Sequence, residues 1–307
     1  MVERSNKPGP LNPTSSTLAD TATFETHSDR VKLSLPTGET AEILLHGATV
    51  ISWKAGGEEK LWLSEKAVLD GSKAVRGGIP LVFPVFGKTT SGPTSALPQH
   101  GFARVSKWEV LGKSSASATS ICVDFGLGSE NVIVDFRKQW PFDFGLIYSV
   151  TLTPMSLETK LLVRNEGNQA FDFQTLFHTY LRVADVGNVK VLGLKGVTYR
   201  DKTQGGAEIK EEPEAVEVKG EIDRMYVQAP GEVQVEESGK TVYTVTRTED
   251  VKDVVVWNPW ENASKNMGDF GPETGYRNMI CVEAGTVSEW NTLEPQTVWE
   301  GGVTVSL

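Results

Sequence analysis

The segment FQTLFHTYLRV (173–183) places one of the chain's four histidines, His178, in an otherwise ordinary strand pattern. Side chains of a β-strand alternate between its two faces. One face is suited to a core and carries Phe173, Thr175, Phe177, Thr179, Leu181 and Val183. The other is mixed and polar, with Gln174, Leu176, His178, Tyr180 and Arg182. A histidine on such a face is more often structural or exposed than catalytic, yet it is also the commonest acid or base in enzymes.

A second strand-like segment, RNMICVEAGTV (277–287), carries a carboxylate among apolar residues. Alternation places Glu283 on one face with Met279 and Cys281, and an apolar set on the other. Burial would raise the pKa of this carboxyl, because desolvation disfavours its charged form. If Glu283 lies near His178, the two could divide acid and base duties near neutral pH. The alternative is that Glu283 faces water at a strand end.

Positive charge is concentrated in one window of an otherwise acid-rich chain. Residues 71–108 contain no Asp or Glu but include VRGGIP and LPQHGFAR, with Arg76 and Arg104. Glycine allows close backbone approach, and a guanidinium binds a phosphate or carboxylate through two parallel hydrogen bonds. We therefore expect the two arginines to clamp one anion. The alternative is that each pairs with a carboxylate elsewhere in the fold.

Other common chemistries lack support in the sequence. The histidines at 27, 46, 100 and 178 show no HxxxH or His-Cys spacing, so we expect no metal site. There is no P-loop and no GxSxG motif. Cys122 and Cys281 form no paired framework and are expected to be buried small side chains. We predict no cofactor.

Many short runs with β-branched residues and alternating polarity follow one another from residue 31 to the C-terminus. No segment shows a sustained helical stripe; SEKAVLDGSKAV (64–75) is at best one or two turns. This pattern predicts an all-β fold, a large antiparallel β-sandwich. Residues 1–23 are rich in Pro, Ser and Thr and are expected to form a disordered tail before a single domain over 24–307.

Composition restricts the partners and the location. The 307 residues carry a net charge of -10, which argues against nonspecific binding to nucleic acid or anionic membranes. No segment is long and apolar enough for a signal peptide or a membrane span. We expect a cytoplasmic protein whose partner is a small molecule, and we favour a monomer.

Several blocks, taken in order, carry a family resemblance: HGATVISWK, LWLSEKAVLDGSKAVRGGIPLVFPVFG, LPQHGFARVSKWEV, LFHTYLRV, EIDRMY, VVWNPW and ICVEAG. The chain resembles the aldose 1-epimerase (galactose mutarotase-like) superfamily and, within it, the hexose-6-phosphate mutarotases. The resemblance implies a β-supersandwich in which Glu283 is the general base and His178 the general acid. It places sugar-phosphate contacts at Arg76, Gln99, Arg104 and Asp223, with His100 as a further candidate.

The reaction implied is interconversion of the α and β anomers of a hexose 6-phosphate, with glucose 6-phosphate as the first candidate, without cofactor or metal. Two alternatives stay open. The first is an aldose 1-epimerase acting on unphosphorylated sugars such as galactose, which the arginines of VRGGIP and HGFAR disfavour. The second is a carbohydrate-binding or regulatory sandwich without activity, against which the presence of both His178 and Glu283 argues.

Overall fold

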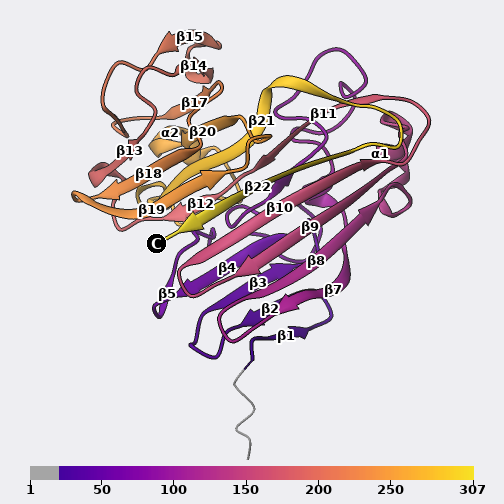
Figure 1. Ribbon diagram of the computed structural model, residues 1–307. Coiled ribbons are helices and arrows are strands. Elements are labelled where there is room, and N and C mark those ends of the chain that lie inside the picture. The colour runs from indigo at the N-terminus through magenta and orange to yellow at the C-terminus, as the bar shows by residue number, and fades with distance from the viewer. Residues whose placement is uncertain (1–20) are drawn as a thin grey trace, which may run out of the picture.

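The computed structural model describes residues 21–307, which form three antiparallel sheets (Figure 1). The smallest sheet has five strands in chain order and lies at the N-terminal end of the described chain. Its strands are β1 (Thr23–Thr26), β2 (Arg30–Ser34), β3 (Thr40–Leu44), β4 (Thr49–Ala55) and β5 (Glu58–Glu59). Ala22 is buried and donates its N–H to the Ser117 carbonyl, so ordered packing begins before β1. The rest of the predicted tail, up to residue 20, lies outside the described residues.

The largest sheet has nine strands in the order β16-β13-β18-β19-β22-β10-β9-β8-β7. Its strands are β7 (Glu109–Ala116), β8 (Ile121–Gly128), β9 (Phe144–Leu152), β10 (Ser156–Asn165), β13 (Val189–Leu192), β16 (Ala215–Glu217), β18 (Glu232–Glu237), β19 (Lys240–Arg247) and β22 (Val298–Ser306). Buried and half-buried residues alternate along β8, β9 and β10. One face of this sheet therefore supplies the core.

The third sheet has eight strands, in the order β15-β14-β17-β20-β21-β11-β6, with β12 also paired to β21. Its strands are β6 (Leu81–Val82), β11 (Phe171–Phe177), β12 (Tyr180–Arg182), β14 (Thr198–Asp201), β15 (Ala207–Lys210), β17 (Ile222–Tyr226), β20 (Asp253–Asn258) and β21 (Met279–Leu293). Alternate residues of β20 and β21, among them Val254, Ile280 and Val282, join the same core cluster as β8, β9 and β10. The predicted antiparallel sandwich is confirmed.

Helical structure is short. The α-helices are α1 (Val134–Gln139) and α2 (Trp260–Lys265), and the 3-10 turns are η1 (Ala103–Val105), η2 (Ser129–Asn131), η3 (Val186–Asn188), η4 (Lys202–Gln204) and η5 (Gly275–Asn278). Within residues 21–307, no helix is both long and apolar enough to cross a membrane. The segment 64–75 contains no helix.

The segment 173–183 differs from its prediction as one strand. β11 ends at Phe177 and β12 begins at Tyr180, and a register shift separates Phe173 from Thr175. Leu176 is fully buried but packs with Val82 and Val255 in a small apolar cluster outside the main core, so it lies on the expected second face. Both strands pair with β21, so the interruption leaves His178 beside that strand.

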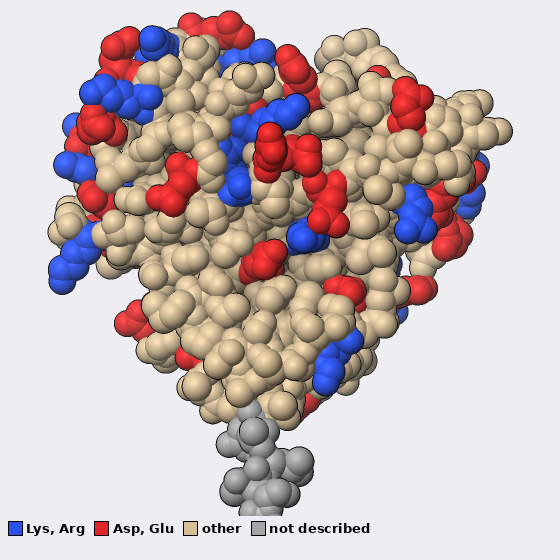
Figure 2. Space-filling model, viewed as in Figure 1, with Lys and Arg blue, Asp and Glu red and all other residues tan. Residues whose placement is uncertain are grey.

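Figure 2 shows that acidic and basic side chains are interspersed on the face seen in Figure 1. They are densest over the lobe that contains β13–β19, whereas the lower part of the view, over β2–β5, is mainly uncharged. On the face in this view, charges of both signs are mixed rather than gathered into a continuous basic surface.

The segment Gly77–Pro80 connects the five-stranded and eight-stranded sheets. The N–H of Ile79 donates to the Val50 carbonyl, and the Gly78 carbonyl accepts from the N–H of Tyr180. Gly78 has φ +67°, and a Cβ at this position would lie 2.1 Å from the Val50 carbonyl oxygen. Only glycine fits both the dihedral and the space.

We predict that Gly78→Ala lowers the free energy of unfolding by about 3 kcal/mol, the sum of backbone strain and a clash with an immobile backbone atom. Gly205→Ala is a matched control, because Gly205 has the same φ of +67° but no atom within 4 Å of a Cβ. It should cost about 1 kcal/mol, from the dihedral alone. Equilibrium urea unfolding measures both. Equal losses would contradict the close-approach argument.

Candidate active site

A polar cavity of about 690 Å³ opens on the face of the eight-stranded sheet that points away from the main core. It is lined by Arg76, Phe86, Gly87, Lys88, Gln99, His100, His178, Lys202, Glu221, Asp223, Val255, Trp257, Met267 and Glu283. Neighbouring strands supply its floor: Asp223 is on β17, Val255 and Trp257 are on β20, and Glu283 is on β21. A floor built on strands holds its side chains in fixed relative positions.

His178 is held by backbone and ring contacts at the break between β11 and β12. Its N–H donates to the Pro80 carbonyl at 3.0 Å, which ties it to the segment that follows Arg76. Its ring stacks on Tyr180 with centroids 4.7 Å apart and an interplanar angle of 8°. Trp257 packs edge-on against the same ring at 5.8 Å. The ring is only 8% exposed, so its orientation is restricted from three sides.

Glu283 is buried because it lies well inside β21 and not at a strand end. It pairs across from Val255 on β20, and its two chain neighbours, Val282 and Ala284, belong to the main core. The residue is 2% exposed. The predicted alternation of faces in this segment is therefore confirmed, and the alternative of a solvent-facing glutamate is wrong.

The two residues meet at the cavity floor. His178 Nδ1 lies 3.2 Å from Glu283 Oε1. The geometry of this contact is not that of a hydrogen bond. Among the described residues, His178 Nδ1 and Glu283 Oε2 have no hydrogen-bond partner. Buried polar atoms are normally satisfied, and because both residues line the cavity, these two atoms are available to a ligand.

Burial shifts the two pKa values in opposite directions. Desolvation raises the pKa of Glu283 well above its usual value, and Lys202 and Arg104 oppose this shift. Desolvation lowers the pKa of His178 well below its usual value, and His100, Arg104, Arg76 and Lys202 lower it further. Both effects favour neutral side chains, so in the empty site a single shared proton resides mainly on the carboxyl.

His100 lies beside the pair, with its ring centroid 6.0 Å from that of His178. Its Nδ1 accepts the N–H of Gly87 at 3.1 Å, so we assign the ring proton to Nε2. Burial lowers the pKa of His100 well below its usual value, followed by the charges of Arg104, Lys202 and Arg76. His100 is therefore a neutral side chain at the cavity wall, and its Nε2 lies 3.3 Å from the side-chain amide of Gln99. The residue has φ +67°, a left-handed conformation held by its backbone bond to Gly87.

Two cations line the cavity while paired with carboxylates. Arg76 Nε contacts Asp269 Oδ1 at 3.2 Å, and its Nη1 donates to the Tyr180 hydroxyl. Lys202 Nζ lies 3.4 Å from Asp223 Oδ1 and 3.9 Å from the centroid of the Phe86 ring. The ion-pair alternative for Arg76 is thus observed, although the side chain still lines the cavity.

Six of the seven residues singled out in the sequence line this one cavity: Arg76, Gln99, His100, His178, Asp223 and Glu283. Arg104 does not line it. Its Nη2 donates to the Gln99 carbonyl at 2.9 Å, and within the described residues its buried Nε has no partner. Lys202 also lines the cavity. The sequence did not indicate this lysine, because it lies far along the chain from the acid-free window 71–108.

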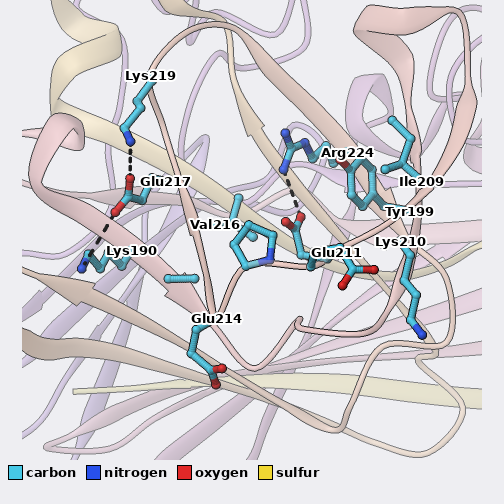
Figure 3. A pocket seen from close by; sticks show the side chains of 13 residues that line it. Lys190, Tyr199, Ile209, Lys210, Glu211, Glu214, Val216, Glu217, Lys219 and Arg224 are labelled. Carbon is cyan, nitrogen blue, oxygen red and sulfur yellow. Dashed lines mark hydrogen bonds and ion pairs between the residues drawn. The ribbon is translucent and has the colours of Figure 1, made fainter.

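A second hollow, of about 650 Å³, lies among β13–β17 (Figure 3). Its charged groups neutralise one another: Arg224 donates to Glu211, and Glu217 lies between Lys190 and Lys219. Its lining contains no histidine or cysteine. The first cavity is therefore the better candidate for acid–base chemistry.

The fold and the site define a class, the mutarotase-like sandwich enzymes. A crystal structure described as a putative mutarotase from Salmonella typhimurium superimposes with a TM-score of 0.81, at 28% identity and 94% coverage of both chains. The family model for aldose 1-epimerase matches residues 29–306. The chain belongs to the aldose 1-epimerase family, and it is an isomerase that interconverts sugar anomers.

Two relatives carry the name "Putative glucose-6-phosphate 1-epimerase". The one from Cenchrus ciliaris is 35% identical over 276 residues, covering 87% of this chain and 80% of that protein. The one from Escherichia coli (strain K12) is 32% identical over 252 residues, covering 81% and 80%.

The pKa shifts predict an unusual protonation state in the ligand-free protein. At about pH 6 an exposed glutamate is ionised, but the Glu283 carboxyl should remain protonated while His178 stays neutral. Carbon-13 NMR of labelled protein measures this state, and Glu283→Gln assigns the signal by removing it. A Glu283 resonance that titrates at the value of free glutamate would contradict the prediction.

Proposed function

We propose that the sugars interconverted are hexose 6-phosphates, with glucose 6-phosphate the first candidate. The observation that carries this proposal is a buried His178–Glu283 pair at the floor of a cavity that Arg76, Lys88 and Lys202 also line. A phosphorylated sugar approaching a protein of net charge -10 needs local positive charge. The names of the two relatives support the same substrate.

Glu283 and His178 divide the proton transfers. Glu283, as carboxylate, takes the proton from the C1 hydroxyl while protonated His178 gives its proton to the ring oxygen, so the C1–O5 bond breaks and an aldehyde forms. After rotation about C1–C2, His178 takes the proton back from O5 as it attacks the other carbonyl face. Glu283 then returns its proton to O1, and the pair regains its starting state.

The number of protons on the pair is constant through the cycle, and only their location changes. Ring opening converts an ion pair into two neutral side chains, which is the form that burial favours. The site therefore stabilises the neutral forms of Glu283 and His178, which are present while the sugar is in its open-chain form. Lys202 and Arg104 favour the carboxylate form of Glu283, which assists the return of its proton to O1 during ring closure.

The remaining residues bind and orient the sugar. Arg76, Lys202 and Lys88 supply positive charge for the phosphate, and Gln99, His100 and Asp223 offer hydrogen bonds to hydroxyl groups. Arg104 holds the Gln99 backbone through a hydrogen bond to its carbonyl and adds positive charge near the site. Because the phosphate is remote from C1, these groups contribute orientation rather than proton transfer. The cytoplasmic location and the monomeric state stay predictions.

Two-dimensional exchange NMR of glucose 6-phosphate at anomeric equilibrium tests the proposal, with free galactose in parallel. We expect the protein to accelerate exchange of the phosphorylated sugar far more than that of galactose. The reverse preference would assign the enzyme to unphosphorylated aldoses. Binding of both sugars without acceleration would support the silent sandwich instead.

His178→Asn should lower the catalysed exchange rate by about 10² to 10⁴, the usual value of one positioned acid or base. Glu283→Gln should cause a loss of similar size. Circular dichroism and urea unfolding check that both variants remain folded. A folded His178→Asn variant with full activity would remove His178 from the mechanism.

Lys202→Met should raise KM for glucose 6-phosphate by about 10-fold or more while changing KM for free glucose little, because only the phosphorylated sugar loses an ionic contact. Lys210→Met is the matched control, since Lys210 is an exposed lysine at the other hollow. It should leave both constants unchanged. Equal increases for both sugars in Lys202→Met would contradict a phosphate contact.

A further inference from the structure

Cys281 lies directly beside the His178–Glu283 pair. It precedes Glu283 by two residues on β21, so both side chains leave the strand on the same face. One ligand atom each from His178, Cys281 and Glu283 lies within 4.8 Å of the others. Cys281 is fully buried and does not line the cavity, so the thiol contacts protein and not the cavity.

The three side chains offer unused ligand atoms. Within residues 21–307, His178 Nδ1 and Glu283 Oε2 lack hydrogen-bond partners although each residue is more than nine-tenths buried. Cys281 is a free thiol. An imidazole nitrogen, a thiolate sulfur and a carboxylate oxygen are the three donor types found at protein zinc sites.

We propose that His178, Cys281 and Glu283 form a binding site for a thiophilic divalent cation, Zn²⁺ above all, and that the ion inhibits anomer exchange by occupying the acid and the base. A fourth coordination position is left for water. The inhibition rests on the proposed function of the pair, whereas the metal site itself does not.

The charges and distances suit this ion. A thiolate and a carboxylate together balance Zn²⁺, so the buried cluster is neutral, as buried charges require. Ligand atoms of a tetrahedral zinc site are about 3.3 to 3.6 Å apart, which follows from bond lengths of about 2.0 to 2.3 Å. His178 and Glu283 are already 3.2 Å apart. The three ligand atoms lie within 4.8 Å of one another, so shifts of roughly 1 Å bring them to the separations of a zinc site.

The donor set also selects the class of metal. Mg²⁺ and Ca²⁺ require six or more oxygen ligands, and the cluster contains one carboxylate. Thiolate and imidazole favour zinc and its analogue cobalt. Binding forms a metal–sulfur bond and breaks the S–H bond, and any proton on Cys281 or Glu283 passes to solvent. Affinity should therefore rise with pH.

Cobalt spectroscopy of the full chain tests the site independently of activity. Co²⁺ bound to a thiolate gives a near-ultraviolet charge-transfer band and intense tetrahedral visible bands. We expect these bands in the wild-type protein and in Cys122→Ser, the matched control, because Cys122 lies on β8, in the nine-stranded sheet. Cys281→Ser and Cys281→Ala should lose the charge-transfer band, and glucose 6-phosphate should displace the ion.

Kinetics with buffered free Zn²⁺ test inhibition. We expect apparent KM to rise with Zn²⁺ while kcat is unchanged, because the ion and the sugar compete. Loss of a ligand should weaken inhibition about 10-fold or more, so Cys281→Ser and Cys281→Ala should exchange anomers normally and resist zinc. Cys122→Ser should be as sensitive as the wild type. The basal activity of each variant reports its folding.

Four results would overturn the proposal or part of it. Absence of the cobalt bands in active wild-type protein would remove the metal site, as would bands that persist in Cys281→Ser. Equal zinc sensitivity of wild type and Cys281→Ala would assign inhibition to another site. Cobalt bands that depend on Cys281, together with exchange that zinc does not inhibit, would support the metal site and contradict the catalytic assignment of His178 and Glu283.

Discussion

The alternation of side chains along β21 is the constraint on which the rest of the structure depends. On one face Ile280, Val282 and Ala284 complete the core between the two large sheets. On the other, Glu283 lines the floor of the site, and Cys281 lies beside it without lining the cavity. A shift of one residue in the pairing of β21 would place the carboxylate in the core and expose the apolar set, so the hydrophobic core fixes the register that the chemistry needs.

A second constraint joins the sheets at the edge of the cavity. The chain from Arg76 to Pro80 passes between β4 and β12, and its backbone bonds reach Val50 on one side and His178 on the other. The same short segment therefore presents a cation to the cavity and fixes the backbone of the histidine. The glycine at position 78 allows this because no side chain fits between the two sheets.

Much of this arrangement could be predicted from local pattern. Period-two alternation predicted the sandwich and the shared face of Cys281 and Glu283, because a strand's geometry is set by its own residues. The break after Phe177 could not be predicted, since it depends on pairing with β21 and on the bond to Pro80. Lys202 carries no local signal either. It reaches the cavity through the pairing of β14 with β17, a contact between distant segments.

The same limit explains why sequence spacing indicated no metal ligands. His178 and Cys281 are far apart in the chain and meet only because β12 pairs with β21. Spacing rules detect ligands on one turn or one loop, whereas a sheet can assemble ligands from any two strands. Arg104 shows the converse, since it belongs to a well-marked block but is not among the residues that line the cavity.

The proposed base, Glu283, lies on the paired strand β21, and the ring of the proposed acid, His178, stacks on Tyr180 at the break between β11 and β12. Packing therefore holds both side chains in place. Yet inversion at C1 requires half a rotation between ring opening and reclosure. The rotation must therefore occur in the substrate. With the rest of the sugar bound, the freed aldehyde carbon turns within the cavity, and the protein acts as a rigid frame within which the sugar moves.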